Sequence, residues 1–438
     1  MRADRFRYAG HDLDRRAGVL TCRYALDGVD FTERYTLPAG DGDDAAVAEA
    51  ARLVYLLAGV SYYKAGAPPL IDLGPTPLRP GDAELLRRFY VEGLGEFAWR
   101  NGLDLSGVEI TGGDDAGPPA SYGPGSGRPL VPFGGGIDSI VTVESLRPSF
   151  PAAALFAMSR QGDRFAAIED AAAVTGLPVV RAGRALDPAI LESARRGWLN
   201  GHVPVTGIVS AVALLVAVLG GHDAVVMSNE WSASFGTVVE GGREVNHQYS
   251  KSLAFETGLR DLLVRSYDAP PEYFSLLRPY SELWVASRFA ALDGYHRVFR
   301  SCNRAFAIDP AARLDHWCGR CDKCCFIDLI LAPFMPAEAL DAVFDGREPL
   351  ADPSLAGRFL ALLGASPDLK PFECVGDVTE CRAAAALAAA RDDRRGNPLL
   401  ARLASAAGPV APADVERLLA PLGPTHAPER YAPTALLA

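Results

Sequence analysis

The chain has 438 residues, of which 49% are hydrophobic and 22% are charged. This length and composition exclude a peptide, a small disulfide scaffold and a disordered protein, and they predict two or three globular domains. The formal net charge of −11 argues against a chain that wraps a nucleic-acid backbone, because such binding depends on clustered Lys and Arg. A local basic pocket for a small anionic substrate is compatible with this charge.

The amino-terminal and apolar segments indicate a protein that is neither exported nor anchored in a membrane. Residues 1–16 are polar and lack the apolar stretch and small-residue cleavage site of a signal peptide. The longest apolar stretch, 207–221, is shorter than the about 20 residues of a membrane span. Four of the eight Cys residues lie between 318 and 325, which in a reducing compartment indicates metal binding or chemistry rather than disulfides. We therefore expect a cytoplasmic protein.

Residues 1–112 are expected to form a small α+β domain. Two β-rich runs within 19–37 flank Asp27-Gly28, which is a hairpin signal. Helical apolar spacing follows at 43–60 and 82–101, and each of these segments begins with acidic residues. The Gly- and Pro-rich stretch 113–128 is then predicted to be a linker between domains.

Residues 129–330 are predicted to form an α/β domain with a parallel sheet. Short apolar runs alternate with helical segments, with strands at 130–133, 153–160, 178–182 and 224–229 and helices from 138, at 164–175 and at 207–220. This alternation is typical of a parallel sheet covered on both faces, whose ligands bind beyond the carboxyl ends of the strands. Residues 331–438 are expected to be a helical, Ala-rich region to which the sequence assigns no chemistry.

The segment Phe133–Ser139, FGGGIDS, lies between the first of these strands and its helix. Its three Gly residues remove every Cβ from the turn, so backbone N–H groups can converge on a phosphate at a helix N-terminus. Gly134, Gly135, Gly136 and Ser139 are therefore candidate phosphate-binding residues, and Asp138 is a candidate Mg²⁺ ligand. The motif is neither a Walker A loop nor a GxGxxG fingerprint. The alternative interpretation is a Gly-rich turn whose Asp caps the helix.

This segment resembles the SGGxDS loop of the PP-loop ATP pyrophosphatases, with Gly134 in place of the first Ser. The resemblance implies a fold similar to the adenine nucleotide alpha hydrolases and a reaction in which ATP adenylates a substrate and is split into AMP and pyrophosphate. Ser159 and Asn229, at the ends of two predicted strands, are expected to contribute to the nucleotide site.

The cluster Cys318-Gly-Arg-Cys321-Asp-Lys-Cys324 has the spacing of a metal-binding knuckle. Cys302 can complete a Cys₄ site for a structural Zn²⁺, and His316 and Cys325 are rival fourth ligands. A set of buried Cys residues without metal is the alternative. A PP-loop followed by a Cys knuckle also resembles the cyano-deazaguanine synthases, but those enzymes are much shorter.

Further stretches are similar to the ATP-dependent UDP-N-acetylmuramoyl-L-alanyl-L-glutamate epimerases. The resemblance covers most of residues 5–340, and it depends on Asn200–Thr206, Met227–Ser234, Val245–Ser252, Leu276–Leu283 and Ser301–Phe306. It implies epimerisation of the terminal L-Glu of a UDP-muramoyl dipeptide to D-Glu, with ATP split into AMP and pyrophosphate, in peptidoglycan biosynthesis. This small molecule is then the expected partner, and no nucleic acid, membrane or obligate protein partner is implied.

The chemistry of such a reaction requires proton handlers at the glutamate Cα. A free carboxylate disfavours loss of the neighbouring Cα proton, and adenylation cancels its charge, so donors in the site can stabilise an enolate-like intermediate. Glu230 directly follows a predicted strand, and His247 and Lys251 are four residues apart and are expected to share one helical turn. These three residues are the candidate catalytic groups. Alternatively, Glu230 is a solvated acid in a turn, His247 is structural and Lys251 contacts a phosphate.

The remaining candidates are expected to bind substrate. Arg160, Arg278 and Arg304 can clamp carboxylate or diphosphate groups by bidentate hydrogen bonds, and His202 lies in a loop beside Pro204. The competing function is that of another adenylating enzyme of the PP-loop type, such as a deazaguanine-type synthase or an amide-forming ligase. A nucleotide-binding regulatory module without turnover is disfavoured by the polar residues at successive strand ends.

Overall fold

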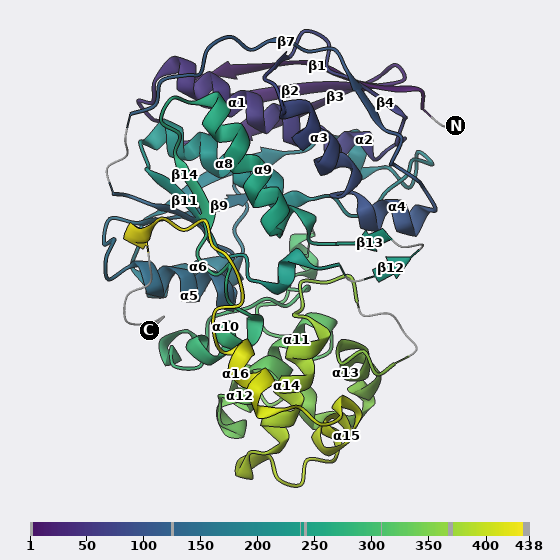
Figure 1. The fold of residues 1–438 in the computed structure, drawn as a ribbon, viewed down its shortest axis with the longest axis vertical. Helices are drawn as coiled ribbons and strands as arrows, with labels where there is room; N and C mark the ends of the chain where they lie inside the picture. Colours follow the sequence, from purple (N-terminus) through teal and green to yellow (C-terminus); the bar gives the residue numbers. More distant parts are fainter. Residues whose placement is uncertain are drawn as a thin grey trace.

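The computed structural model describes residues 3–123, 127–236, 238–240, 243–307, 309–366 and 371–431. An α/β body built on one large sheet makes up the upper part of Figure 1, and a helical region made from the last part of the chain lies below it. The fold is therefore α/β with a large, mostly parallel sheet, as the alternation of strands and helices predicts.

The sheet has ten strands in the order β14-β11-β8-β9-β10-β3-β2-β1-β4-β6. The first five of these pair in parallel and are β14 (Glu272–Ser275), β11 (Ala224–Met227), β8 (Leu130–Pro132), β9 (Ala154–Ser159) and β10 (Val179–Ala185). An antiparallel meander follows, made of β3 (Val29–Thr36), β2 (Val19–Leu26) and β1 (Arg5–Asp14). Two parallel strands complete the sheet, β4 (Leu70–Asp72) and β6 (Glu109–Thr111).

Two small pairs of strands lie outside this sheet. They are β5 (Pro77–Leu78) with β7 (Asp114–Asp115), and β12 (Val238–Glu240) with β13 (Arg243–Val245).

The strands before and after the expected linker at 113–128 belong to the same sheet. β10 pairs antiparallel with β3, so that Gly183 lies opposite Thr36. One hydrophobic core also includes side chains from Phe6 in β1 to Tyr273 in β14. The free edge of the meander is a pairing site for a strand, and β10 occupies it. The Gly- and Pro-rich stretch therefore joins two parts of one sheet and does not separate two hydrophobic cores.

Helices cover both faces of the sheet. The helices that precede the linker are α1 (Asp44–Ala58), α2 (Val60–Tyr63), α3 (Asp82–Val91) and α4 (Gly95–Asn101). Those of the central region are α5 (Ile137–Leu146), α6 (Ala166–Thr175), α7 (Pro188–Leu191), α8 (Val205–Gly220), α9 (Leu253–Ser266) and α10 (Glu282–Phe289). The segment 82–101, predicted as one helix, is two helices interrupted around Gly93.

Successive side chains of each strand enter different cores, because side chains alternate between the faces of a sheet. Leu130 and Val225 pack with α1, α8 and α9, whereas Val131 and Val226 pack with α5 and α6. Figure 1 shows these two groups of helices on opposite sides of the sheet. The segment Asp44–Tyr63 is long and apolar enough to span a membrane, but 89% of its apolar window is buried within the fold.

The helical region contains α11 (Asp322–Leu331), α12 (Ala337–Val343), α13 (Ala356–Leu362), α14 (Val378–Ala389), α15 (Pro398–Ala407) and α16 (Pro412–Leu418). Short 3-10 helices lie at Ser232–Ser234, Tyr249–Lys251, Asp293–Tyr295, Pro310–Ala312, Pro349–Ala351, Pro353–Leu355, Asp392–Arg394 and Glu429–Tyr431. The small side chains of α14 allow close packing, and Ala383, Ala384 and Ala388 are fully buried.

The final described segment returns from α16 to the α/β body, as the yellow chain in Figure 1 shows. The Leu422 amide donates to the Pro279 carbonyl over 2.7 Å, and the Tyr431 hydroxyl donates to Asp223 over 3.0 Å. The helical region is therefore tied to the body at its beginning, through α11, and again near the carboxyl terminus.

Candidate active site

A cavity of about 390 Å³ opens at the carboxyl ends of β8, β9 and β11, where a parallel sheet is expected to bind its ligands. Six of the residues predicted from the sequence line it: Gly134, Gly136, Asp138, Ser139, Asn229 and Lys251. Its apolar wall comes from Phe133, Phe156, Met158, Ile168 and Phe306. Its other polar residues include Thr206, Ser228, Arg300, Ser301, Lys323 and Cys374.

The glycine loop connects β8 to α5, and its shape requires glycine at one position in particular. Gly135 has a φ of +73°, and a Cβ there would overlap the carbonyl oxygen of Ala167 in α6. Gly136 is the residue before α5, in extended conformation, and Ser139 donates to its carbonyl over 3.1 Å. The loop therefore packs against α6 on one side and presents the N-terminus of α5 to the cavity on the other. Backbone N–H groups at such a terminus are suited to bind phosphate oxygens.

Asp138 lies in the first turn of α5, and its charge acts on two buried acids from other parts of the chain, Glu230 and Glu282. One of its carboxylate oxygens, Oδ1, is buried without a hydrogen-bond partner among the described residues. Burial raises the pKa of Asp138, although Lys323 and Lys251 act in the opposite direction. Burial and the charge of Asp138 raise the pKa of both Glu230 and Glu282. A divalent cation would relieve this repulsion, and the donor set of carboxylate oxygens is the one that Mg²⁺ prefers.

The residues predicted at the strand ends have different surroundings. Asn229 lines the cavity, and its carbonyl accepts a hydrogen bond of 2.5 Å from Ser275. Glu230 is 5% exposed, and its carboxylate accepts from the Ala233 amide over 2.8 Å, so it lies behind the cavity lining. Ser159, at the end of β9, donates to the Asp163 carbonyl over 2.8 Å. Arg160 is exposed and does not line the cavity.

His247 and Lys251 do not share a helical turn, contrary to the prediction. Lys251 ends a short 3-10 helix, and α9 begins only at Leu253, because Ser252 caps it by accepting from the Phe255 amide over 3.2 Å. The two side chains nevertheless interact with the same residue, because Lys251 donates to the Cys374 sulfur over 3.0 Å and the interaction with Cys374 raises the pKa of His247. The predicted proximity of the two residues to a common group therefore holds, but the predicted helical turn is wrong.

His247 belongs to a second hydrogen-bonded unit, with Glu96 of α4 and His202. The Nδ1 atom of His247 lies 2.6 Å from a Glu96 carboxylate oxygen, and the His202 and His247 rings are 4.4 Å apart between centroids. Burial alone would lower the pKa of His247, but its hydrogen bonds with Cys374 and Glu96 raise it to about 9. Burial and the charge of His247 lower the pKa of His202 to about 4. At neutral pH His247 is thus a cation, and His202 is neutral.

The predicted arginine clamps do not reach the cavity. Arg278 is fully buried and forms an ion pair of 3.0 Å with Glu256 in α9, and it donates to the carbonyls of Glu230 and Lys251. The ion pair joins Arg278 to α9 itself, and the two carbonyl bonds fix segments that precede α9, so this placement does not agree with a direct contact to substrate. Arg304 is exposed and is absent from the cavity lining.

A different arginine lines the cavity. This is Arg300, which pairs with Asp170 over 2.9 Å.

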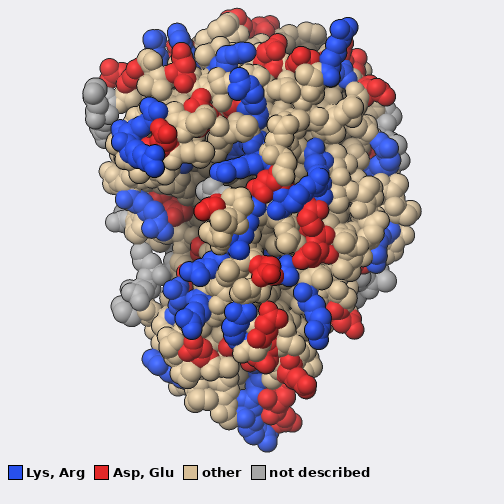
Figure 2. Space-filling view, turned by 180° about the vertical axis from the view of Figure 1, so that it is seen from behind, with Lys and Arg blue, Asp and Glu red and all other residues tan. Residues whose placement is uncertain are grey.

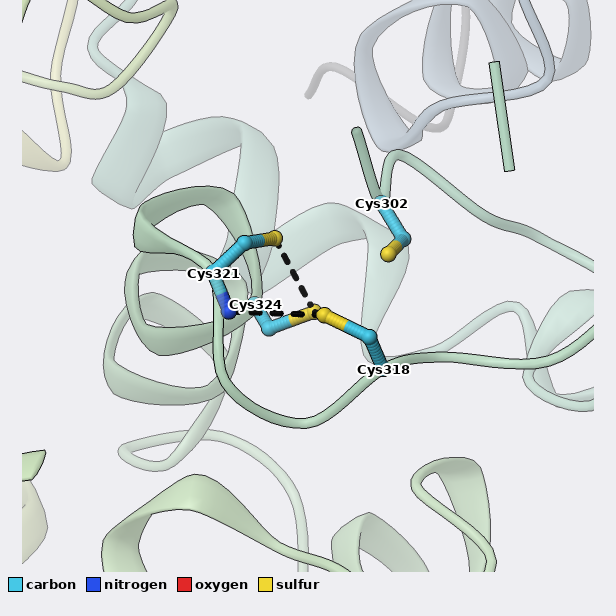
Figure 3. A group of neighbouring side chains, drawn as sticks. All are labelled: Cys302, Cys318, Cys321 and Cys324. Carbon is cyan, nitrogen blue, oxygen red and sulfur yellow. Dashed lines mark hydrogen bonds between the residues drawn. The ribbon is translucent and has the colours of Figure 1, made fainter. Parts of the chain in front are cut away.

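The Cys knuckle has the geometry of a metal site. The sulfur atoms of Cys302, Cys318, Cys321 and Cys324 lie within 4.8 Å of one another, and Cys324 is 3.6 Å from Cys318 and 3.4 Å from Cys321. Sulfur atoms around a tetrahedral Zn²⁺ would be about 3.8 Å apart, given a Zn–S distance of about 2.3 Å. Figure 3 shows Cys302 on a separate loop, with its side chain directed at the three knuckle residues. The donor set therefore fits Zn²⁺, and zinc binding stays a prediction.

The fold explains how these four side chains come together. Cys321 precedes α11 and Cys324 lies in its first turn, while a tight turn at Gly319, whose φ is +68°, directs Cys318 back toward both. The Cys321 amide donates to the Cys318 sulfur over 3.4 Å. Neither rival fourth ligand belongs to the group, because His316 pairs with Asp315 and Cys325 is buried in the hydrophobic core.

Sequence reasoning missed the most highly charged part of the cavity. Cys374 lies on the segment that precedes α14, and the Lys251 ammonium donates to its sulfur over 3.0 Å. The Lys323 ammonium donates to the Cys374 carbonyl. The scarcity of Lys was a usable signal, because two of the three Lys residues that the structure describes line this cavity. The fourth, Lys370, is outside the described residues.

The charges on the surface are mixed on the face that Figure 2 shows. Lys and Arg side chains are interspersed with Asp and Glu over most of that face. Cations are concentrated instead inside the cavity, where Lys251, Lys323 and Arg300 surround a space of small-molecule size. The expectation of no nucleic-acid partner stays a prediction.

Two models of known protein families match most of the chain. Family models described as the MurL N-terminal domain and the MurL C-terminal domain match residues 1–276 and 298–417. No solved structure gives a significant match.

Three curated relatives carry the name UDP-N-acetyl-alpha-D-muramoyl-L-alanyl-L-glutamate epimerase. The relative from Xanthomonas oryzae pv. oryzae is 42% identical over 91% of this chain and 88% of its own length. Those from Salinispora tropica and a Micromonospora species are 39% and 40% identical, and each alignment covers 98% of this chain and 95% or 97% of the relative. The resemblance noted from the sequence is thus confirmed, and the chain belongs to the family of UDP-N-acetyl-alpha-D-muramoyl-L-alanyl-L-glutamate epimerases.

Proposed function

We propose that this chain epimerises the terminal L-Glu of UDP-N-acetylmuramoyl-L-Ala-L-Glu to D-Glu in peptidoglycan precursor synthesis, and that ATP first adenylates the carboxylate beside the glutamate Cα. The names of the relatives support the substrate and the isomerase reaction. One observation supports the chemistry above all others. A glycine loop at a helix N-terminus and a cluster of titratable side chains share a single cavity.

The glycine loop and the apolar wall suit a nucleotide. The loop from Gly134 to Gly136 would hold phosphate groups by its N–H groups, and Ser139 adds a hydroxyl near them. Phe156 and Met158 of β9 and Ile168 of α6 form an apolar surface on which a purine can pack. These features support a nucleotide site of the PP-loop type, with adenine on the wall and phosphates at the loop.

Mg²⁺ fits the carboxylates at this loop. Asp138 offers a buried oxygen that lacks a hydrogen-bond partner among the described residues, and Asn229 lines the same cavity. A bound Mg²⁺ would neutralise charge on the phosphates of ATP. Asp138 is the residue that we expect to hold it.

The cations of the cavity are suited to the developing negative charge. Adenylation removes the carboxylate charge, so loss of the Cα proton generates an enolate rather than a second anion beside the first. Lys251, Lys323 and Arg300 line the cavity in which that charge would develop. Water then hydrolyses the adenylate and releases AMP. The residues proposed for proton transfer therefore act after ATP has been used.

The Cys knuckle has a structural role in this proposal. We propose that it binds a structural Zn²⁺, because all four of its ligand positions are protein thiols, which leaves no open position for a substrate. Cys302 immediately follows Ser301 of the cavity, and Cys324 follows Lys323. A zinc ion would thus fix two segments that carry cavity residues. We also propose that the protein acts in the cytoplasm.

The test is the formation of AMP, pyrophosphate and the D-Glu product from UDP-N-acetylmuramoyl-L-Ala-L-Glu and ATP. The D-Glu epimer and UDP-N-acetylglucosamine serve as controls. We expect ATP consumption only with the muramoyl dipeptides. Formation of an amide that depends on added ammonia or amine would show a ligase or a deazaguanine-type synthase instead. Epimerisation at full rate without ATP would contradict adenylation.

A further inference from the structure

We propose that Cys374 is a catalytic residue of the epimerisation, the base that takes the proton from the glutamate Cα, with Lys251 and His247 as the cations that pair with its sulfur. This assignment rests on the proposed function. It concerns a residue of the helical C-terminal region, to which the sequence assigned no chemistry.

The geometry places Cys374 among the groups that a base would need. Its side chain lines the cavity that also contains the glycine loop and Asp138. The Lys251 ammonium lies 3.0 Å from the sulfur and is held in turn by Gln248 at 3.1 Å. The charge of His247 also acts on this sulfur and stabilises its ionised form. Two cations that converge on one thiol in a cavity are the surroundings in which a thiolate is stable.

The protonation states of Cys374, Lys251 and His247 indicate which of them can accept a proton. Burial alone would raise the pKa of Cys374, but Lys251, His247 and Lys323 lower it to about 5. The same ion pairing raises the pKa of Lys251 above its usual value, against the effect of burial, and raises that of His247 to about 9. At neutral pH, Cys374 therefore carries no proton, whereas Lys251 and His247 both do. His247 and Lys251, two of the three predicted catalytic groups, are therefore already protonated and serve as cations instead of bases.

Other charged groups face the thiol, and they do not reverse this assignment. Lys323, from α11, adds a further positive charge and holds the Cys374 carbonyl. Glu373 is the nearest acid on the same segment, and it is occupied by a hydrogen bond of 2.8 Å from Asn303. Burial and the Cys374 charge raise the pKa of Glu373. Apart from burial, the largest influences on the pKa of Cys374 all come from cations.

The step conserves atoms and charge. The Cα–H bond of the adenylated glutamate breaks, an S–H bond forms on Cys374, and the electron pair moves into the enolate of the activated carboxyl group. A proton then returns to the opposite face of Cα from a donor in exchange with water. The Cys374 thiol releases its own proton to water, and hydrolysis of the adenylate yields the D-epimer.

Contacts from distant parts of the chain hold Cys374 in place. Phe372 packs against Trp99 of α4 at 5.2 Å between ring centroids, and the Arg100 guanidinium lies 5.1 Å from the Phe372 ring. The Asp377 carboxylate caps α14 through the Glu380 amide at 2.8 Å, which fixes the chain three residues after the thiol. The segment is thus held at both ends while its thiol faces the cavity.

The decisive experiment separates adenylation from proton transfer. Cys374→Ala and Cys374→Ser are supplied with UDP-N-acetylmuramoyl-L-Ala-L-Glu and ATP in D₂O. Pyrophosphate release and deuterium at the glutamate Cα are measured together. We expect deuterium incorporation to fall about a hundredfold or more, as for loss of a general base, while pyrophosphate release stays within about fivefold of wild type. The variants would then hydrolyse the adenylate back to the L-epimer.

Cys381→Ala is the matched control, because Cys381 is another thiol of the same region that lies in the core and not in the cavity. It should keep the wild-type ratio of deuterium incorporation to pyrophosphate release. If both rates fall equally in Cys374→Ser, or deuterium incorporation persists, the assignment is overturned. A wild-type protein that releases no pyrophosphate would overturn the proposed function itself, and that result is visible before any variant is made.

A second measurement examines the thiol without turnover. The rate of alkylation of Cys374 by iodoacetamide, followed by mass spectrometry of its peptide, should reach half its maximum near pH 5 in the wild type. In Lys251→Met this midpoint should rise by about one unit or more, since the nearest cation is lost. A midpoint that is the same in both proteins would overturn the pairing with Lys251.

Discussion

Asp138 is a buried acid at the cavity whose burial a bound cation would explain. Its Oδ1 atom has no partner among the described residues, and burial raises its pKa, so the ionised form is unfavourable in the protein alone. We predict that Asp138→Asn lowers pyrophosphate release about a hundredfold or more, because it removes a metal ligand. The melting temperature at pH 7 should be unchanged or higher, because a buried charge is lost.

Asp12→Asn, on the exposed part of β1, is the matched control and should change neither quantity. Pyrophosphate release at the wild-type rate in Asp138→Asn would contradict the role of Asp138 at the metal.

His247 makes stability depend on pH in a defined direction. Its pKa is raised from 6.5 to about 9. The stability that the charged imidazole contributes to the fold is therefore fully present below pH 6.5 and is lost as the pH rises through about 9. Cys374 acts oppositely, with a pKa lowered from 9.0 to about 5, and it is still ionised at pH 6.5. We predict that His247→Gln lowers the free energy of unfolding more at pH 6.5 than at pH 10, measured by denaturant titration. Equal losses at both values would contradict the ion pair.

At the scale of elements, the glycine loop requires glycine at position 135 but has room for a side chain at position 134. Gly135→Ala would force a side chain into the left-handed region and against the Ala167 carbonyl. We predict a loss of about 1–3 kcal/mol in the free energy of unfolding, together with weaker ATP binding. Gly134→Ala is the control, because a Cβ there meets no atom within 4 Å. Equal stability of the two variants, measured by denaturant titration, would show that the loop is free to adjust.

The knuckle before α11 is a second element whose role can be measured directly. If it binds zinc, Cys321→Ser should lower zinc content and melting temperature together, because metal binding adds to the free energy of folding. Cys325→Ser, a thiol outside the cluster, should keep the metal even if it destabilises the core. Elemental analysis that finds no zinc in wild-type protein purified without chelator would favour a metal-free set of thiols.

Local patterns predicted the central strands and helices well, because each depends on residues close in the sequence. Val131, Leu155 and Val226 lie in the strands expected from their apolar runs, and the Gly loop lies at the end of the first. The start of α9 was misplaced because Ser252 caps the helix and excludes the residues before it. The loop at 247–251 takes its shape from tertiary bonds, such as Arg278 to the Lys251 carbonyl, and no local pattern encodes them.

Contacts between distant segments account for the residues that the sequence did not reveal. Cys374 is 123 residues from Lys251, and it lies in a Pro-containing segment with no motif of its own. The antiparallel pairing of β10 with β3 likewise joins parts of the chain that composition assigned to separate domains. A sequence pattern can identify a strand, but which edge it joins depends on the packing of the whole molecule.

On the scale of the whole molecule, the candidate site is made where three regions of the chain meet. The glycine loop comes from the parallel half of the sheet, Glu96 and Trp99 come from α4 near the amino terminus, and Cys374 comes from the helical region. Phe372 joins two of these regions, since its ring lies 5.2 Å from that of Trp99 in α4 and 6.3 Å from that of His247. Phe372 is two residues before Cys374, so its packing against α4 helps to hold the thiol in position.

We therefore predict that Phe372→Ala impairs proton transfer more than adenylation. Loss of the ring would free the segment that carries Cys374, while the glycine loop and Asp138 keep their places on α5. Deuterium incorporation at Cα should fall about tenfold further than pyrophosphate release, as expected when a reacting group is displaced by a fraction of an ångström. Phe150→Ala is the matched control, because Phe150 stacks on Tyr431 at 4.5 Å and also joins distant segments, but away from the cavity. That variant should lose stability while its ratio of deuterium incorporation to pyrophosphate release stays at the wild-type value. If both variants change the ratio alike, the effect reflects general loosening of the fold and not the placement of Cys374.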